Sequence, residues 1–314
     1  ERWAATELAP HIGGDGKPHR SPDFTYRTMF SGWDVFRSQC PLLTVIAPEI
    51  VSDQVNSLVQ LADLSGRSFS RWDILNCDSG CMVGSPAVSV AADAYLKGIR
   101  GFDVEKAYAI AKRTVSAVEG KPGWTPGSLS WTLENAYFNH CMALWAAALG
   151  KTEEARDFAG RAQRYRNTFD PAVNWMRSRL ENGEWVPWQG RTVGGQGCVE
   201  SNPFQQGWFV PHDVQGLINL LGQDRFLADL QEFFAKTPLS FKWNDYYNHA
   251  NEPVHHVPYL FTYAGAPWLT QYWTRLVMER AYGAGVKGLC GNDDVGQMSA
   301  WYVLSAVGLH PVSP

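Results

Sequence analysis

Three short polar segments of the chain carry acidic residues directly ahead of apolar stretches. They span residues 200–213, 251–256 and 291–294, and the last of them reads Gly-Asn-Asp-Asp. A carboxylate displayed at the start of an apolar helix can bind a ligand or exchange a proton, because the helix behind it is anchored in the core. Since all three segments share this construction, we expect them to meet in one pocket.

Glu200 is the candidate proton donor of this pocket. It follows a Gly-rich approach at residues 194–197 and precedes Asn202, Gln205 and Trp208, so that amide and aromatic groups surround one carboxyl group. Such an environment raises the pKa of a carboxylic acid and keeps a proton available for a leaving group. The structural alternative is a Glu that caps the following helix.

Asp294 is the candidate base, and we assign Asn292 to the catalytic group with it. Two adjacent acids cannot both be pure helix caps, so at least one of Asp293 and Asp294 is free to receive or position a water molecule. In the alternative, both acids only complement the positive end of the next helix. Two carboxyl groups from separate turns, one acid and one base, are the minimum apparatus for glycoside hydrolysis, with tryptophan stacking on the sugar.

The middle segment has the character of a cation site. Glu252, His255 and His256 lie within one turn and offer oxygen and nitrogen ligands. Zinc is disfavoured, because adjacent histidines point in different directions and lack the i, i+4 spacing of a zinc-binding helix. Carboxylate, amide and carbonyl oxygens favour a hard cation such as calcium. In the first segment, Asp213 precedes an apolar run and is expected to be an N-cap.

Composition narrows the class of protein. The 314 residues carry a net charge of −4 without a basic stripe, which argues against a nucleic-acid partner. No stretch approaches the roughly 18 apolar residues of a membrane span. The 14 Trp, 12 Tyr and 15 Phe suit sugar rings as well as a core. The six cysteines are too scattered for a zinc ribbon, and we expect buried thiols or one or two disulfides.

The elements that must position these turns are helices. Apolar residues recur at helical spacing from about Ser52 onward, strand-like alternation is scarce, and Asp103 and Ser130 with Glu134 look like helix starts. Ten to twelve helices without a sequence repeat favour a closed (α/α)6 barrel, a toroid of helix pairs with long loops, over a solenoid. We expect residues 1–30 to be a connector from an upstream domain of a longer enzyme and residues 31–314 to be the barrel. The predicted helical segments are 55–62, 87–97, 104–118, 133–149, 153–165, 214–221, 225–234, 257–263, 269–282 and 295–307.

Several long motifs, in the same order, give the chain a family resemblance. It resembles glycoside hydrolase family 92, the calcium-dependent exo-acting α-mannosidases, over nearly its whole length. The matching motifs are residues 30–37, 92–98, 208–213, 251–256 and 291–301. The main departure follows Glu200, where Glu-Ser-Asn-Pro-Phe-Gln-Gln stands in place of Glu-Gly-Asn-x-Trp-Gln-Tyr.

The resemblance implies an (α/α)6 barrel that packs against an N-terminal β-sandwich and removes terminal α-linked mannose, with inversion, from N-glycan-type oligosaccharides. It implies Glu200 as the acid, Asp294 as the base, and calcium bound by Asn251, Glu252 and Asp294. A secreted, extracellular or periplasmic location is expected. The alternatives are a metal-free (α/α)6 glycosidase of other specificity and a mannoside-binding module without turnover. The expected substrate contacts are Trp33, Asp34, Arg71, Trp72, Asn202, Gln205, His212, Asp213, His255 and Asp293.

Overall fold

The structure, a computed structural model, describes residues 10–117 and 122–313, whose regular secondary structure is almost entirely helical. Three two-residue antiparallel hairpins are the only sheets in this described part: β1 His11–Ile12 with β2 Pro18–His19, β3 Asp73–Ile74 with β4 Cys77–Asp78, and β5 Phe169–Asp170 with β6 Trp175–Met176. The α-helices are α1 Gly32–Val35, α2 Gln39–Ile46, α3 Pro48–Ser65, α4 Pro86–Leu96, α5 Val104–Ala117, α6 Leu129–Ala148, α7 Thr152–Ala162, α8 Pro203–Gln206, α9 Val214–Leu221, α10 Gln223–Ala235, α11 Leu260–Tyr263, α12 Pro267–Arg280 and α13 Gln297–Val307. Three 3-10 helices complete them: η1 Gln163–Thr168, η2 Glu252–Val254 and η3 Val257–Tyr259.

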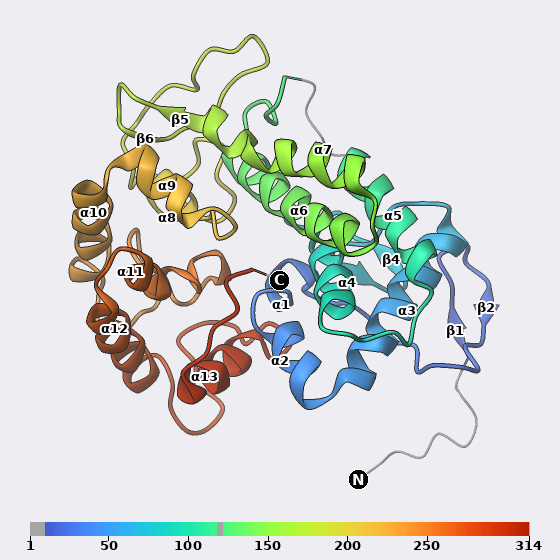
Figure 1. Cartoon of the computed structure of the whole chain (residues 1–314). Helices are drawn as coiled ribbons and strands as arrows, with labels where there is room; N and C mark the ends of the chain where they lie inside the picture. The colour runs from blue at the N-terminus through green and yellow to red at the C-terminus, as the bar shows by residue number, and fades with distance from the viewer. Residues whose placement is uncertain (1–9, 118–121, 314) are drawn as a thin grey trace.

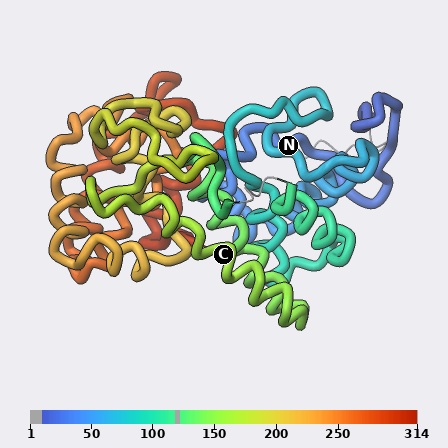
Figure 2. Tube along the Cα trace, turned by 90° about the horizontal axis from the view of Figure 1, so that it is seen from above, coloured from blue at the N-terminus to red at the C-terminus, as the bar shows by residue number. Residues whose placement is uncertain are grey.

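The helices run round a common centre in chain order (Figure 1). Sequence neighbours pack as pairs, α2 on α3, α4 on α5, α6 on α7, α9 on α10 and α11 on α12. Helix α13 returns to α2, so the last helix meets one of the first and the ring closes. The Cα trace seen from above shows the chain passing from the first half to the second through the long α6 and α7 region (Figure 2). The predicted all-α class and the toroid of helix pairs are confirmed.

The helix starts follow from local chemistry, with one correction. Asp103 accepts a hydrogen bond from Lys106 N at 3.0 Å at the start of α5, and Pro stands at the first position of α4 and α12. The prediction for Ser130 was wrong, because Ser128 caps α6 by accepting from Trp131 N. The hydroxyl of Ser130 instead donates to Gln206, the last residue of α8.

Other predicted boundaries shift or fall outside the described residues. Segment 257–263 forms two short helices, η3 and α11, and the helix predicted from Val295 begins at Gln297. Val118 and residues 1–9 lie outside the described part of the chain, and the domain division after residue 30 stays a prediction.

All six cysteines are free, with Cys40 and Cys141 buried, so the structure contains the expected thiols without a disulfide. None of the described helices is both long enough and apolar enough to cross a membrane.

Candidate active site

Three carboxylates from distant parts of the chain meet where α1, η2 and the turn ahead of α13 approach one another. Asp34 lies on α1, Glu252 begins η2, and Asp294 lies in the turn 291–296. One carboxylate oxygen from each of them lies within 4.8 Å of the other two. The second and third polar segments therefore share one site, as expected, and α1 adds an acid to it.

The cluster concentrates negative charge with little solvent to screen it. Burial, and then the charge of Asp294, raises the pKa of Asp34 to about 8, although the positive charge of Arg37 opposes the shift. Burial and both other acids raise the pKa of Glu252 well above its usual range, and burial raises that of Asp294. One buried oxygen each of Asp34 and Glu252 has no hydrogen-bond partner. Such a group holds shared protons or a cation, because closely spaced carboxylates cannot all stay ionised alone.

Glu200 adjoins this cluster from the first polar segment. Its carboxyl group is exposed, and its pKa is raised by partial desolvation and by the charge of Asp294. The backbone of Glu200 has a positive φ of 50°, and its carbonyl accepts a hydrogen bond from Asn251 Nδ2 at 3.0 Å. The alternative that Glu200 caps α8 is wrong, because Asn202 is the N-cap and forms a capping box with Gln205.

The amides predicted as ligand contacts are paired with the protein. Asn202 Nδ2 donates to the carbonyls of Thr192 and Asp245, and Gln205 Nε2 donates to those of Asn244 and Tyr246. These bonds tie the loop that carries Glu200 to residues 244–246. The side chain of Asn251, predicted as a metal ligand, is likewise turned to the carbonyl of Glu200. Asp34, which we expected to bind the sugar, lies among the clustered acids.

The turn that carries Asp294 has an unusual backbone. Asp294 and Val295 both have positive φ, 45° and 59°, and Gly296 follows at 93°. A β-branched residue in this region is strained, and such strain is typical of functional turns. Gly291 lets the turn approach Ala250, since a Cβ at Gly291 would lie 2.7 Å from the Ala250 Cα. The turn is therefore shaped to bring Asp294 to the segment that carries Glu252.

The two acids of this turn have different surroundings. Asp293 Oδ1 accepts from Ser299 N and from its hydroxyl, both at 3.0 Å, so Asp293 supports the first turn of α13 as the capping alternative proposed. Asp294 points to the acid cluster instead. Asn292 is exposed on the same turn.

Two buried histidines, His255 and His256, follow Glu252 in the chain. Gln297 Oε1 accepts from two backbone N–H groups, so its amide nitrogen faces His255 Nδ1 at 3.2 Å, and that ring nitrogen accepts. His255 Nε2 then carries the proton and donates to the carbonyl of His249. His256 Nε2 contacts the carbonyl of Trp208. Burial lowers the pKa of His255 to about 3 and that of His256 to about 4, so both rings are neutral.

Other predicted contacts lie beside the cluster or away from it. Trp33 is fully buried, and its indole N–H donates to Glu134. Arg71 donates to the carbonyls of Gly80 and Cys81 and stacks on Trp131, while Trp72 meets Phe30 edge-on. His212 bonds the carbonyl of Ala162, and Asp213 caps α9 and accepts from Tyr165, so both belong to the α7 and η1 region. The capping expectation for Asp213 is confirmed.

Sequence reasoning missed two charged residues next to the site, Glu134 and Arg37. Glu134 is fully buried within α6, and Arg37 is 8% exposed near Asp34. A lone acid in the apolar stretch of α6 was the available signal, although we interpreted Glu134 as part of a helix start. Arg37 carried a weaker signal in its i, i+4 spacing from Trp33.

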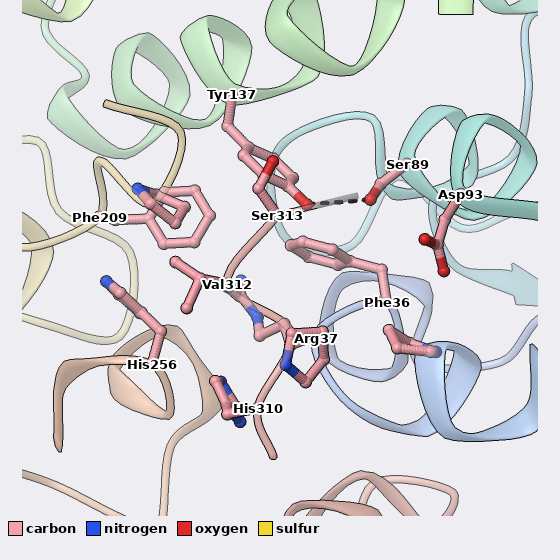
Figure 3. A pocket seen from close by; sticks show the side chains of 13 residues that line it. Phe36, Arg37, Ser89, Asp93, Tyr137, Phe209, His256, His310, Val312 and Ser313 are labelled. Atoms are coloured by element: carbon pink, nitrogen blue, oxygen red, sulfur yellow. Dashed lines mark hydrogen bonds between the residues drawn. The ribbon is translucent and has the colours of Figure 1, made fainter. Parts of the chain in front are cut away.

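A small cavity of about 30 Å³ lies on another side of Arg37 (Figure 3). Phe36, Tyr137, Phe209 and His256 line it together with the C-terminal residues Pro311 to Ser313. The three clustered carboxylates do not line this cavity, and we therefore place the site on the carboxylates.

Two solved structures and one curated sequence are similar to this chain. The structure of the family GH92 α-mannosidase BT3965 from Bacteroides thetaiotaomicron is similar with a TM-score of 0.91 and 36% identity, over 98% of this chain and 43% of that one. The family GH92 inverting mannosidase BT2199 from the same organism matches with a TM-score of 0.84 and 31% identity, over 97% of this chain and 47% of that one. An uncharacterized secreted glycosidase of Arthroderma benhamiae is 27% identical over an alignment of 287 residues, and the match covers 75% of this chain and 36% of that protein.

The chain thus spans less than half the length of each of these proteins. Residues 4–314 match the model of the glycosyl hydrolase family 92 catalytic domain. This match extends over every polar segment of the site. The chain belongs to glycoside hydrolase family 92.

Proposed function

We propose that this chain is the catalytic barrel of an inverting α-mannosidase that removes terminal non-reducing mannose. The observation that carries the proposal is the cluster of Asp34, Glu252 and Asp294 with Glu200 beside it. Its acids come from separate elements and have raised pKa values, as acid and base catalysis requires. The similarity to an α-mannosidase and to an inverting mannosidase supports the choice of sugar and of stereochemistry.

Each catalytic acid has one task in this proposal. Asp294 takes a proton from a water molecule whose oxygen attacks the anomeric carbon, while the bond to the leaving oxygen breaks. Glu200 gives its proton to that oxygen, and the raised pKa of Glu200 keeps the proton in place beforehand. The product is mannose of inverted configuration, and the two carboxyl groups finish with their protonation states exchanged.

The acid cluster fits a calcium ion. Three carboxylates with two buried unpartnered oxygens form an oxygen-rich, strongly negative site of the kind that hard cations occupy. Asp34, Glu252 and Asp294 would hold the ion, and Asp34 thereby extends the ligand set of Asn251, Glu252 and Asp294 expected from the sequence. A bound calcium would supply positive charge for ordering sugar hydroxyl groups. Because a carboxylate has two oxygens, Asp294 can contact the ion and still receive a proton.

The wider setting of the enzyme is also a proposal. We infer that it acts on N-glycan-type oligosaccharides, outside the cell or in the periplasm, together with an N-terminal β-sandwich domain. The likeness to a secreted glycosidase supports this location. The share of the solved mannosidases that this chain leaves uncovered provides room for a further domain.

Hydrolysis of an aryl α-mannoside, with calcium and then with excess chelator, tests the proposal when the anomer released is followed by NMR. We expect calcium-dependent release of β-mannose. Activity unaffected by chelator would favour a metal-free glycosidase, and mannoside binding without turnover would favour a binding module.

A further inference from the structure

The buried acid Glu134 connects α6 to the element that carries Asp34. Glu134 is fully buried, and its Oε1 accepts from Trp33 Nε1 at 2.7 Å. The same oxygen lies 3.4 Å from Arg37 Nη2. Trp33 directly precedes Asp34, and Arg37 follows it by one turn. The carboxylate of Glu134 therefore contacts one residue before Asp34 and one after it, from a helix about 100 residues away in sequence.

The surroundings of Glu134 are shaped around its carboxylate. A Cβ at Gly84 would lie 2.2 Å from Glu134 Oε2, and Gly84 has a positive φ of 81°. Only glycine thus lets this backbone close on the carboxylate without displacing it. The fit is hard to explain by helix formation alone, because any apolar residue would serve α6 equally well at this position.

Arg37 carries the effect of Glu134 toward the acid cluster. Its Nε donates to the carbonyl of Trp33, and its guanidinium lies 5.1 Å from the ring centre of Trp33 and 4.9 Å from that of Phe209. Figure 3 shows Arg37 among Phe36, Phe209 and His256. The positive charge of Arg37 opposes the rise in the pKa of Asp34. The guanidinium group of Arg37 is thus held beside Glu134 and near enough to Asp34 to influence its carboxyl group.

We propose that Glu134 is a positioning residue for the reaction: it locks Trp33 and Arg37, and through them it sets the orientation and the charge balance of Asp34. This inference rests on the proposed function. Glu134 is not one of the three clustered carboxylates, so its loss should affect catalysis and cation binding through Asp34. Residues that orient metal ligands in this way typically account for about 10–100-fold in metal affinity or activity.

Two variants separate the parts of this network. Glu134→Gln keeps an oxygen acceptor for Trp33 and removes the charge opposite Arg37, whereas Trp33→Phe removes the hydrogen bond and keeps the ion pair. We expect each to lower kcat by about 10-fold or more with a much smaller change in KM, and to weaken calcium binding measured by titration calorimetry. Glu105→Gln is the matched control, because it removes a Glu from an exposed pair with Lys151 and should change neither quantity.

The outcomes are decisive even where one variant fails. If Glu134→Gln lowers only the melting temperature and leaves kcat and calcium affinity at wild-type values, Glu134 is merely structural and the inference is overturned. If that variant does not fold, Trp33→Phe carries the test by the same two readouts. If the wild-type chain hydrolyses no mannoside, the proposed function fails. The positioning role of Glu134 is judged separately: it is overturned if both variants bind calcium as tightly as the wild type.

Discussion

At the scale of single residues, the site is defined by an imbalance of charge. Three carboxylates lie in one cluster, the positive charge of the buried Arg37 acts on one of them, Asp34, and Arg37 is already paired with Glu134. The consequence is that the pKa values of the acids rise and that protons or a cation must compensate. Glu200 lies at the solvent-exposed edge of this cluster, and its pKa is raised by partial desolvation and by the charge of Asp294.

The division of labour between acid and base predicts a specific pair of variants. Glu200→Gln and Asp294→Asn should each lower kcat on a natural mannoside by about 10²–10⁴-fold, because each removes one proton transfer with little change in volume. An aryl mannoside with a good leaving group should partly restore Glu200→Gln and not Asp294→Asn, because such a leaving group needs less acid help. Steady-state kinetics on both substrates checks this, and equal restoration of the two variants would reverse or void the assignment.

The raised pKa of Asp34 predicts a pH-dependent effect on stability in the absence of calcium. A carboxyl group whose pKa rises to about 8 on folding supports the fold below its unfolded value near 4, and this support is lost as the pH rises toward 8. Asp34→Asn should therefore stabilise the chelated protein at pH 8 by on the order of a few kcal/mol, since each pKa unit is worth about 1.4 kcal/mol.

Chemical unfolding at pH 4.5 and pH 8, with chelator and with calcium, measures this effect. The advantage of the Asn variant should shrink at pH 4.5 and reverse when calcium is added. A variant that is less stable than wild type with chelator at pH 8 would contradict the ionic origin of the shift.

At the scale of elements, periodicity located the long helices, and short-range chemistry decided their ends. Helices α1 and α8 have four residues each and carry or flank site residues, but they are too short to show a period in sequence. Ser130 misled the start of α6 because Ser128, two residues earlier, was equally suitable as a cap.

The residues of the candidate site fall into two groups in the same way: those that local sequence identifies and those that only the fold brings together. Polar turns revealed Glu200, Glu252 and Asp294, because local sequence places an acid at a helix entry. Glu134 and Arg37 could not be assigned, since their importance comes from contacts across about 100 residues. Local sequence likewise does not say which oxygens face inward, and Asp34 joins the clustered acids through contacts that only the fold creates.

The turn before α13 contains a strained residue whose replacement should raise the stability of the fold. Val295 is 51% exposed and has a φ of 59°, so its side chain contributes strain and little packing. Val295→Asn should stabilise the fold by about 0.5–1 kcal/mol, because Asn tolerates the left-handed region better than a β-branched residue. Val303→Asn, at a comparably exposed helical position, is the control and should be neutral or slightly destabilising. Thermal unfolding of both variants decides whether the strain is real.

At the scale of the whole molecule, the barrel brings its two ends together at the site. Asp34 on α1 and Asp294 ahead of α13 lie near opposite ends of the described chain, and they become neighbours only because α13 packs on α2. The closure of the ring and the assembly of the acid cluster are therefore the same event. A helix bundle with the same elements left open would keep Glu200 and Glu252 together but would lack the remaining acids.

Gln297 is the residue on which this closure can be tested. Its Oε1 accepts from Ser38 N and Gln39 N, the first of which is 259 residues away, and its Nε2 donates to His255. Gln297→Leu should cost about 1–3 kcal/mol of unfolding free energy, because it leaves buried donors unsatisfied at the start of α2. It should also weaken calcium binding, since the elements that carry Asp34 and Asp294 are no longer fastened. Gln271→Leu on the outer helix α12 serves as the control. If Gln297→Leu were destabilised to this degree but bound calcium as tightly as wild type, the acid cluster would be held by α1 and the turn 291–296 alone, and closure of the barrel would not be what assembles the site.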